Sequence, residues 1–494
     1  MKEQKQFKRY IPLLIKEKLD ELNYHRKDDL YVIIDLIYRK EMYYKSDYQD
    51  LYGFTEISQK QFKELLPSSD GFNSAIQFLI NNDLVKRNDY YIIKGGKPKG
   101  YKLPKELLSR TIPVMISEKN INKRIGHQLK LNRKMKEKRL EFAQSKYFKT
   151  FRIDFDEAEK AIIKRTCSEI KKLCFNLGLT YTESDILDII ECRKNHLDKR
   201  FKIIIHPSGK ELHNIMHRYI IHTTRLNAIN DGFLFFKRND TNGRLDTNLT
   251  SLPSYLRPYI ISNEKLINLD IKNSQPYFLY ALIKDNPTIN QDELKMYAEL
   301  VVSGMLYEFM AKQYSSYTGY SRTRKQMKHL VYKIFFSKNQ SFKKQKDFFG
   351  KMFPTIMTFI NQTNNINNNT LALSLQQLES TTVLDIIMPL LQKEGIIPFT
   401  IHDSFVCMES EAERIRTTFI EKLTELFGIA PAMHMDYILP EIEEQEELID
   451  WNEFLEEMNK ESKELEQVDS TAIKIFPKYS KEEIHTLIQE LVIK

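Results

Sequence analysis

The chain has 494 residues, and its 75 Lys plus Arg against 67 Asp plus Glu give a formal net charge of +8. Its hydrophobic fraction of 41% supports buried cores, which excludes a wholly disordered chain. Only four cysteines are present, which excludes a disulfide scaffold and predicts a reducing, cytoplasmic setting. The first residues lack the apolar core of a signal peptide, and no apolar run is long enough to span a bilayer, so we expect no membrane contact.

The positive charge is distributed unevenly along the chain. Residues 441–469 hold thirteen acidic and two basic residues, a net charge of −11, so the remainder carries +19. Residues 118–150 alone contain eleven Lys or Arg and three Glu. Such a surplus attracts polyanions, of which nucleic acid is the commonest, although a solvated charged surface would have the same composition.

The N-terminal region, residues 1–110, is predicted to be a small helical domain that ends in a hairpin. Residues 72–85 place apolar side chains at helical spacing, and two β-prone runs follow at 90–93 and 101–103. The turn between them, 94–100, is rich in glycine and lysine. Helices followed by a basic hairpin are typical of a winged-helix-like DNA-binding domain, and the alternative is a helical cap with an incidental hairpin.

Residues 111–225 are predicted to be helical and basic, and residues 441–494 to be an acidic helical tail. The basic side chains of the first segment cluster within about twenty residues, where they could grip the backbone of a duplex. A charged solvent face would look the same. The clustered residues are Lys119, Lys123, Arg124, Lys130, Arg133, Lys134, Lys136, Lys138 and Arg139.

Two aspartates stand at the ends of apolar runs in the segment 226–440. Residues 266–271 form a short β-prone run with Asp270 as its next-to-last residue, and residues 397–407 form a hairpin-like run with Asp403 near its tip. Adjacent strands can place such carboxylates side by side. Paired carboxylates suit Mg²⁺, which also takes substrate phosphates and water as ligands, and two such ions can promote attack on a phosphate.

A predicted helix between the two aspartates carries a basic and aromatic face. Arg324, Lys328, Tyr332 and Phe336 recur every four residues, which places them on adjoining parts of one helical face. The cations could hold a triphosphate and the aromatic rings could stack on a base or sugar. The alternative is an ordinary amphipathic basic helix.

These elements together resemble the family A polymerases, the group of bacterial DNA polymerase I and the single-subunit phage RNA polymerases. Four segments resemble the family's motifs and follow in its order. They are Gly243-Arg244-Leu245 (the primer–template contact), Asp270–Gln275 (motif A), Arg324–Phe336 (motif B) and Ile401-His402-Asp403-Ser404 (motif C).

The resemblance implies an α+β right-hand fold. Residues 226–440 would form the palm and fingers, and residues 111–225 would form a helical thumb that follows the winged-helix-like domain. The implied activity is two-metal nucleotidyl transfer, in which a primer 3′-hydroxyl attacks the α-phosphorus of an incoming nucleotide.

The resemblance also implies a role for each matching residue. Asp270 and Asp403 would be catalytic and would bind two Mg²⁺ ions, which Mn²⁺ could replace. Arg324 and Lys328 would hold the triphosphate of a dNTP. The others would contact nucleotide, primer or template: Tyr332 the sugar and base, Phe336 the templating position, His402 the primer terminus, Arg244 the primer–template backbone, and Gln376 or Gln377 the template strand.

The choice of sugar is predicted from positions at which the family's subgroups differ. Gln275 replaces the Glu by which the DNA polymerases exclude a ribose, and Phe336 lacks the hydroxyl that helps RNA polymerases select one. Ser404 instead matches the RNA polymerase form of motif C. The balance favours a DNA polymerase, and the alternative is an RNA polymerase or primase of the single-subunit type.

The region before residue 226 is too short for both a thumb and a proofreading nuclease, and its first 200 residues hold no Asp-x-Glu element. We therefore expect no 3′–5′ exonuclease. By analogy, the N-terminal domain suggests a replication protein of a phage, plasmid or mobile element. A second alternative is a catalytically inactive DNA-binding initiator. Glu379 and Asp385 are predicted to be solvated or helix-capping, and the sequence does not predict an oligomeric state.

Overall fold

The computed structural model describes residues 6–43, 54–67, 69–88, 98–132, 138–190, 210–367 and 369–440. They form helices and short strands, as the α+β prediction states. The predicted strand 90–93 and the predicted acidic tail 441–494 lie outside the described residues. The chain divides into two compact units. The first comprises Met1–Lys136, Thr150–Phe236 and Thr247–Ile261, and the second comprises Glu137–Lys149, Lys237–Asp246 and Ser262–Lys494.

The first unit contains an antiparallel strand pair that joins distant parts of the sequence. Strand β1 (Lys8–Pro12) precedes helix α1 (Leu13–Glu21) and pairs with β5 (Thr111–Met115). Arg9 on β1 is buried and lies 3.3 Å from the Asp35 carboxylate of helix α2 (Lys27–Tyr43). Because β5 belongs to this packing, the division into units does not follow the predicted boundary at residue 110.

A three-stranded sheet and three helices make up the middle of the N-terminal region. The sheet has the antiparallel order β2-β4-β3, and the rings of Phe62, Phe72 and Tyr101 pack together beside it. A capping box between Ser58 and Gln61 starts helix α3. After α2 the elements are β2 (Thr55–Glu56), α3 (Gln59–Leu65), α4 (Ser69–Asn81), β3 (Lys86–Arg87) and β4 (Gly100–Lys102).

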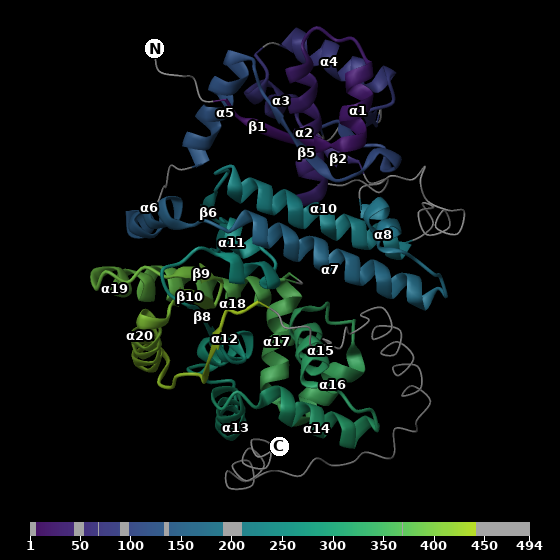
Figure 1. The fold of residues 1–494 in the computed structure, drawn as a ribbon. Coiled ribbons are helices and arrows are strands. Elements are labelled where there is room, and N and C mark those ends of the chain that lie inside the picture. Colours follow the sequence, from purple (N-terminus) through teal and green to yellow (C-terminus); the bar gives the residue numbers. More distant parts are fainter. Residues whose placement is uncertain are drawn as a thin grey trace. The chain divides into compact units, whose positions relative to one another are not determined.

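Helices dominate the described residues between 119 and 230, as predicted. Helices α7 (Phe155–Asn176) and α10 (Lys210–Asn230) pack side by side in the first unit (Figure 1), and the predicted boundary at residue 225 falls inside α10. Asp154 caps α7 by accepting a bond from the Glu157 amide. The other helices are α5 (Lys119–Asn132), α6 (Glu141–Thr150) and α8 (Glu183–Ile190).

The second unit is built on a four-stranded antiparallel sheet with the order β11-β8-β10-β9. Helix α20 (Glu409–Phe427) packs against this sheet (Figure 1). Phe405 of the sheet and Phe419 of the helix meet edge to face with ring centroids 5.5 Å apart. Side chains alternate between the faces of a strand, so Asp270 and Asn268 point away from this core. The strands are β8 (Leu266–Ile271), β9 (Phe399–Ile401), β10 (Ser404–Met408) and β11 (Met433–Tyr437).

The remaining helices of the second unit lie between β8 and β9 in the sequence. A π-helical segment, Thr381–Ile387, joins two of them. None of the helices in the described part of the chain is long and apolar enough to cross a membrane. The helices are α12 (Ser274–Ile283), α13 (Gln291–Val302), α14 (Leu306–Thr318), α15 (Arg324–Phe336), α16 (Lys343–Met352), α17 (Pro354–Ile366), α18 (Thr370–Ser380) and α19 (Met388–Lys393).

A tight turn between β6 (Phe236–Arg238) and β7 (Leu245–Thr247) packs against the end of α18. The Ser380 hydroxyl donates to the Asn242 carbonyl at 3.0 Å. The next residue, Gly243, has a φ of +70°, and a Cβ atom there would lie 2.6 Å from Ser380 Oγ. Glycine is therefore required at this turn both by its backbone conformation and by the close approach of α18.

We expect Gly243→Ala to lower the free energy of unfolding by roughly 2–4 kcal/mol, since it adds a clash to the strain of a left-handed alanine. Gly395→Ala is the matched control, because Gly395 has a φ of +80° but no atom lies within 4 Å of the place that its Cβ would take. Gly395→Ala should lower the free energy of unfolding by only about 1–2 kcal/mol. Urea unfolding of both variants measures the difference, and equal costs would contradict the close packing of the turn.

Candidate active site

Asp270 and Asp403 lie at the same end of the second unit's sheet. Asp270 is the next-to-last residue of β8 and stands directly opposite Ser404, the first residue of β10. Asp403 immediately precedes Ser404 in the turn from β9. Adjacent strands are about 4.8 Å apart, so the two carboxylates extend from neighbouring points of the backbone.

The turn that carries Asp403 has a demanding backbone conformation. It contains only His402 and Asp403, and His402 has a φ of +57°, in the left-handed region that most side chains avoid. The Ser404 hydroxyl donates to the Ile401 carbonyl at 3.0 Å and closes the turn. His402, which was predicted to contact the primer, therefore stands beside Asp403 at the tip of a tight hairpin.

The two carboxylates are coupled electrostatically. Burial, reinforced by the negative charge of Asp403, raises the pKa of Asp270 to about 7. The positive charge of Lys328 acts in the opposite direction and lowers the pKa of Asp270. The site thus concentrates negative charge that a nearby cation partly balances.

Helix α15 presents the four predicted residues on the side away from its core. A capping box between Thr323 and Gln326 starts the helix just before Arg324. Arg324 and Lys328 are exposed, while Tyr332 and Phe336 are half-buried. The opposite side packs into the unit through Met327, Leu330, Val331, Ile334 and Phe335.

Two of these four residues, Lys328 and Tyr332, interact electrostatically with the aspartates. Burial and then the charge of Asp403 raise the pKa of the Tyr332 phenol to about 12, so Tyr332 lies near that aspartate. Lys328 Nζ is 5.8 Å from the centroid of the Tyr332 ring, and the Phe336 ring is 5.7 Å from it. Arg324 instead pairs with Glu308, with 2.5 Å between Nε and Oε1.

A third carboxylate, Glu379 at the end of α18, belongs to the same cluster. The prediction that Glu379 is solvated or caps a helix is wrong, because its side chain is fully buried. Arg244 donates to it through Nε at 2.8 Å and Nη2 at 3.0 Å, and Gln275 donates through Nε2 at 2.6 Å. Leu371, Leu375 and Glu379 are spaced by four on one buried helical face, a signal that could have revealed the burial of Glu379.

Glu379 connects this network to the aspartate pair. Burial raises the pKa of Glu379 to about 8, the charge of Asp403 adds to the effect, and Arg244 opposes it. Arg244 was predicted to contact nucleic acid. In the structure its guanidinium supports a buried carboxylate, with its side chain only 18% exposed.

Asp385 was also predicted to be solvated or helix-capping, and this is wrong as well. Its carboxylate accepts two bonds from Arg238, at 2.6 and 2.7 Å, and both side chains are 16% exposed. Asp385 lies in the π-helical segment, where the backbone differs from a regular α-helix. The segment follows Glu379 directly, so both carboxylates pair with arginines of the β6–β7 hairpin.

Gln376 and Gln377, the predicted template contacts, both bind the β6–β7 turn. Gln376 Oε1 accepts from the Asn242 side chain at 3.1 Å. Gln377 donates through Nε2 to the Thr241 carbonyl at 2.8 Å. Two hydrogen bonds thus join helix α18 to the turn that precedes the Gly-Arg-Leu segment, more than 130 residues away in the sequence.

Strand β11 adds two polar residues that sequence reasoning missed. His434 stands opposite Asp270 and Asp436 stands opposite Asn268, so all four share the open face of the sheet. His434 Nδ1 lies 2.7 Å from an Asp436 carboxylate oxygen, and the charge of Asp436 contributes to the raised pKa of Asp270. The alternation of Met433-His-Met-Asp-Tyr437 was the available signal.

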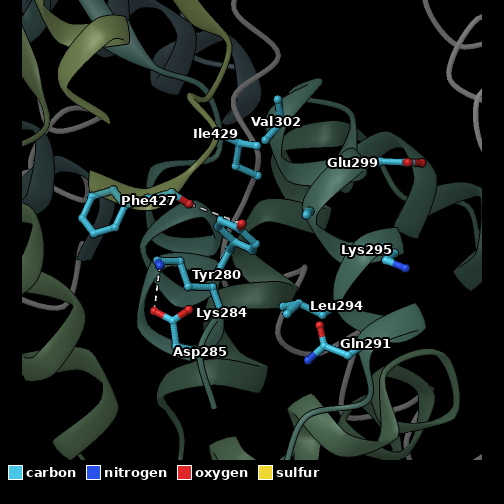
Figure 2. Close-up of a pocket in the computed structure, with 11 residues that line it drawn as sticks. Tyr280, Lys284, Asp285, Gln291, Leu294, Lys295, Glu299, Val302, Phe427 and Ile429 are labelled. Carbon is cyan, nitrogen blue, oxygen red and sulfur yellow. Dashed lines mark hydrogen bonds and ion pairs between the residues drawn. The ribbon is translucent and has the colours of Figure 1, made fainter. Parts of the chain in front are cut away.

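Two cavities lie away from these residues. One, of about 440 Å³, opens between α12, α13 and the end of α20 and is lined by Tyr280, Lys284, Lys295 and Phe427 among others (Figure 2). The other, of about 570 Å³, lies in the first unit beside Lys123, Arg124 and His127 of α5. Neither is lined by a predicted site residue. Among the described residues, no group of three or more His, Cys, Asp or Glu could hold a metal ion.

Neither a protein-family model nor a curated protein matches the chain. Among solved structures, it is similar to one described as the POL domain of Pol1 from M. smegmatis in complex with DNA primer-template and dNTP. The two share 12% sequence identity with a TM-score of 0.43, and the match covers 64% of this chain and 73% of that one.

Proposed function

We propose that this protein is a template-dependent DNA polymerase that adds deoxynucleotides to a primer 3′-hydroxyl and has no proofreading exonuclease. The observation that supports the proposal best is the placement of Asp270 and Asp403. They share one end of a sheet, and Lys328 and Tyr332 of α15 interact electrostatically with them. Paired carboxylates beside a cation and an aromatic ring suit nucleotidyl transfer, which depends mainly on positioning and charge stabilisation.

The aspartate pair fits a divalent metal site in its chemistry. Both are hard oxygen donors, and their repulsion in a partly buried place would be relieved by a cation. Two carboxylates suit Mg²⁺, which also uses substrate phosphates and water as ligands. When bound, the metal would stabilise the negative charge that develops on the phosphoryl oxygens.

The side chains of α15 would bind and orient the nucleotide. Lys328 is exposed and close to Asp270, so its ammonium group can neutralise a triphosphate held beside the aspartates. Arg324, one turn earlier, would contact the far end of the triphosphate after releasing or sharing Glu308. Tyr332 would lie against the sugar and base, and Phe336, whose ring adjoins that of Tyr332, would lie beside the templating position.

The N-terminal region is proposed to bind duplex DNA as a winged-helix-like domain. The order α2-β2-α3-α4-β3-β4, with the antiparallel sheet order β2-β4-β3, supports this proposal. The loop between β3 and β4 would be the wing, and its tip, residues 89–97, lies outside the described residues. The basic residues of α5 add a second group that could contact phosphates.

The catalytic assignment predicts how primer extension responds to substitution. The wild-type protein should extend a labelled DNA primer on a template with dNTPs and Mg²⁺, and Asp270→Asn or Asp403→Asn should reduce the rate by about 10³-fold or more, since each removes a charged metal ligand. Asp285→Asn, at an exposed aspartate remote from the site, is the matched control and should retain activity.

Other results of the primer-extension assay would favour one of the alternative functions or refute the site. Extension with rNTPs alone would favour an RNA polymerase or primase over the proposed function. DNA binding without synthesis under either set of nucleotides would favour an inactive initiator. Undiminished synthesis by both Asp→Asn variants would refute the assignment of the active site.

The raised pKa of Asp270 predicts how stability depends on pH in the absence of metal. Its folded value, about 7, exceeds the value of about 4 for an unfolded aspartate. The stability contributed by its proton is therefore fully present below pH 4 and is lost as the pH rises through 7. We expect Asp270→Asn to gain on the order of 1–3 kcal/mol over the wild type between pH 4 and 8, as measured by urea unfolding in a chelator.

Added Mg²⁺ should offset the loss of stability that the wild-type protein shows at high pH. At pH 8 it should raise the Tm of the wild type, because it binds the folded state, and have little effect on Asp270→Asn. A stability difference between the two proteins that does not change with pH, together with equal responses to Mg²⁺, would contradict a coupled carboxylate pair at this site.

A further inference from the structure

We propose that Glu379 is a positioning residue that fixes the side-chain amide of Gln275, and through it sets the sugar selectivity of the active site. The inference rests on the proposed polymerase function and deepens it. It concerns a contact between α18 and α12 that joins residues 104 positions apart. Glu379 itself is not expected to touch the substrate.

Within the described ranges, three polar side chains donate hydrogen bonds to the Glu379 carboxylate. Arg244 supplies Nε and Nη2, Gln275 supplies Nε2 at 2.6 Å, and the Ser274 hydroxyl lies 3.4 Å from Oε2. Arg244 donates to both carboxylate oxygens, which favours the ionised form of Glu379 against the effect of burial. An ionised carboxylate accepts bonds and donates none, so it is matched to these neighbours. Its complete burial makes any loss of a partner costly.

This arrangement determines which way the Gln275 amide faces. Because Glu379 is an acceptor, the amide nitrogen must turn toward it and the carbonyl oxygen must point elsewhere. Gln275 is only 7% exposed, and its Oε1 is buried without a hydrogen-bond partner in the described part of the chain. The side chain is therefore held in one orientation, with a free acceptor on its other side.

The fixed amide lies beside the place where a nucleotide sugar would bind. Gln275 is in the first turn of α12, five residues after Asp270. Glu379 and Arg244 both act electrostatically on the Tyr332 phenol, whose pKa is raised mainly by burial. The negative charge of Asp403 in turn contributes to the raised pKa of Glu379. The Glu379–Gln275 bond thus adjoins both the carboxylate pair and the aromatic face of α15.

A side chain held in this way can discriminate between sugars by shape. A ribose carries one hydroxyl more than a deoxyribose, and a neighbouring side chain that cannot move would exclude that hydroxyl from the proposed site. If the bond to Glu379 is weakened, Gln275 can rotate away and admit the larger sugar. Selectivity would then depend on a residue that never contacts the nucleotide.

The test compares kcat/KM for dNTP and rNTP incorporation by the full-length protein. Glu379→Gln preserves size but places an amide NH₂ among donors, so the dNTP-to-rNTP ratio should fall by about tenfold or more. Gln275→Ala should lower the ratio similarly. The double variant should match Gln275→Ala alone, because Glu379 acts through Gln275.

Two further variants separate positioning from general damage. Asp385→Asn breaks the neighbouring Arg238 pair and should leave the ratio unchanged even if it lowers Tm. The exchange Gln275→Glu with Glu379→Gln restores an acceptor facing a donor and should recover much of the selectivity that Glu379→Gln loses. Circular dichroism melting of every variant establishes that it is folded at the assay temperature.

The inference is overturned if Glu379→Gln incorporates dNTPs and rNTPs with the wild-type ratio. It is equally overturned if that substitution shifts the ratio as much in the Gln275→Ala background as in the wild type. Failure of the proposed function itself would look different, since the wild-type protein would then incorporate no dNTPs at all.

Discussion

Concentrated negative charge at one end of a small antiparallel sheet is the constraint on which the second unit depends. The charge of Asp403 acts on both Asp270 and Glu379, and Glu379 is entirely buried. Such a group persists only if cations and donors surround it. Arg244 and Lys328 supply the positive charge from two different segments, a hairpin and a helix. The fold of this unit can be understood as the means of bringing those segments to the acids.

The β6–β7 hairpin and α18 form the main support of the cluster. Their contacts include Arg244 with Glu379, Arg238 with Asp385, and the turn with both glutamines. Gly243 lets the turn approach Ser380 closely enough for these bonds to form. A site held from behind by so many bonds is preorganised, which is what charge stabilisation of a transition state requires. The contacts of the hairpin and α18 therefore hold Glu379 and Arg244 in fixed positions behind the aspartate pair.

Much of the local structure could be predicted from the sequence because it depends on neighbouring residues. The apolar run that contains Asp270 is a strand, the four-residue spacing of Arg324 to Phe336 lies on a helix, and Asp403 stands in a tight turn. The contacts that Glu379, Asp385 and Arg244 make in the structure differ from the predicted ones, because their partners lie more than 130 residues away in the sequence. No local pattern indicates such a partner, although the spacing of Leu371, Leu375 and Glu379 indicated burial.

Local sequence was enough to identify the candidate acids, the basic and aromatic helix face and the concentration of positive charge outside the acidic tail. Strand and helix periods and charge counts can be read from adjacent residues. Folding of the whole chain was needed to place Asp270 opposite both Ser404 and His434 on its two neighbouring strands. It was needed equally to bring Arg244 to Glu379, and Glu379 to Gln275. Those contacts depend on strand register and on long-range packing, which have no counterpart in local spacing.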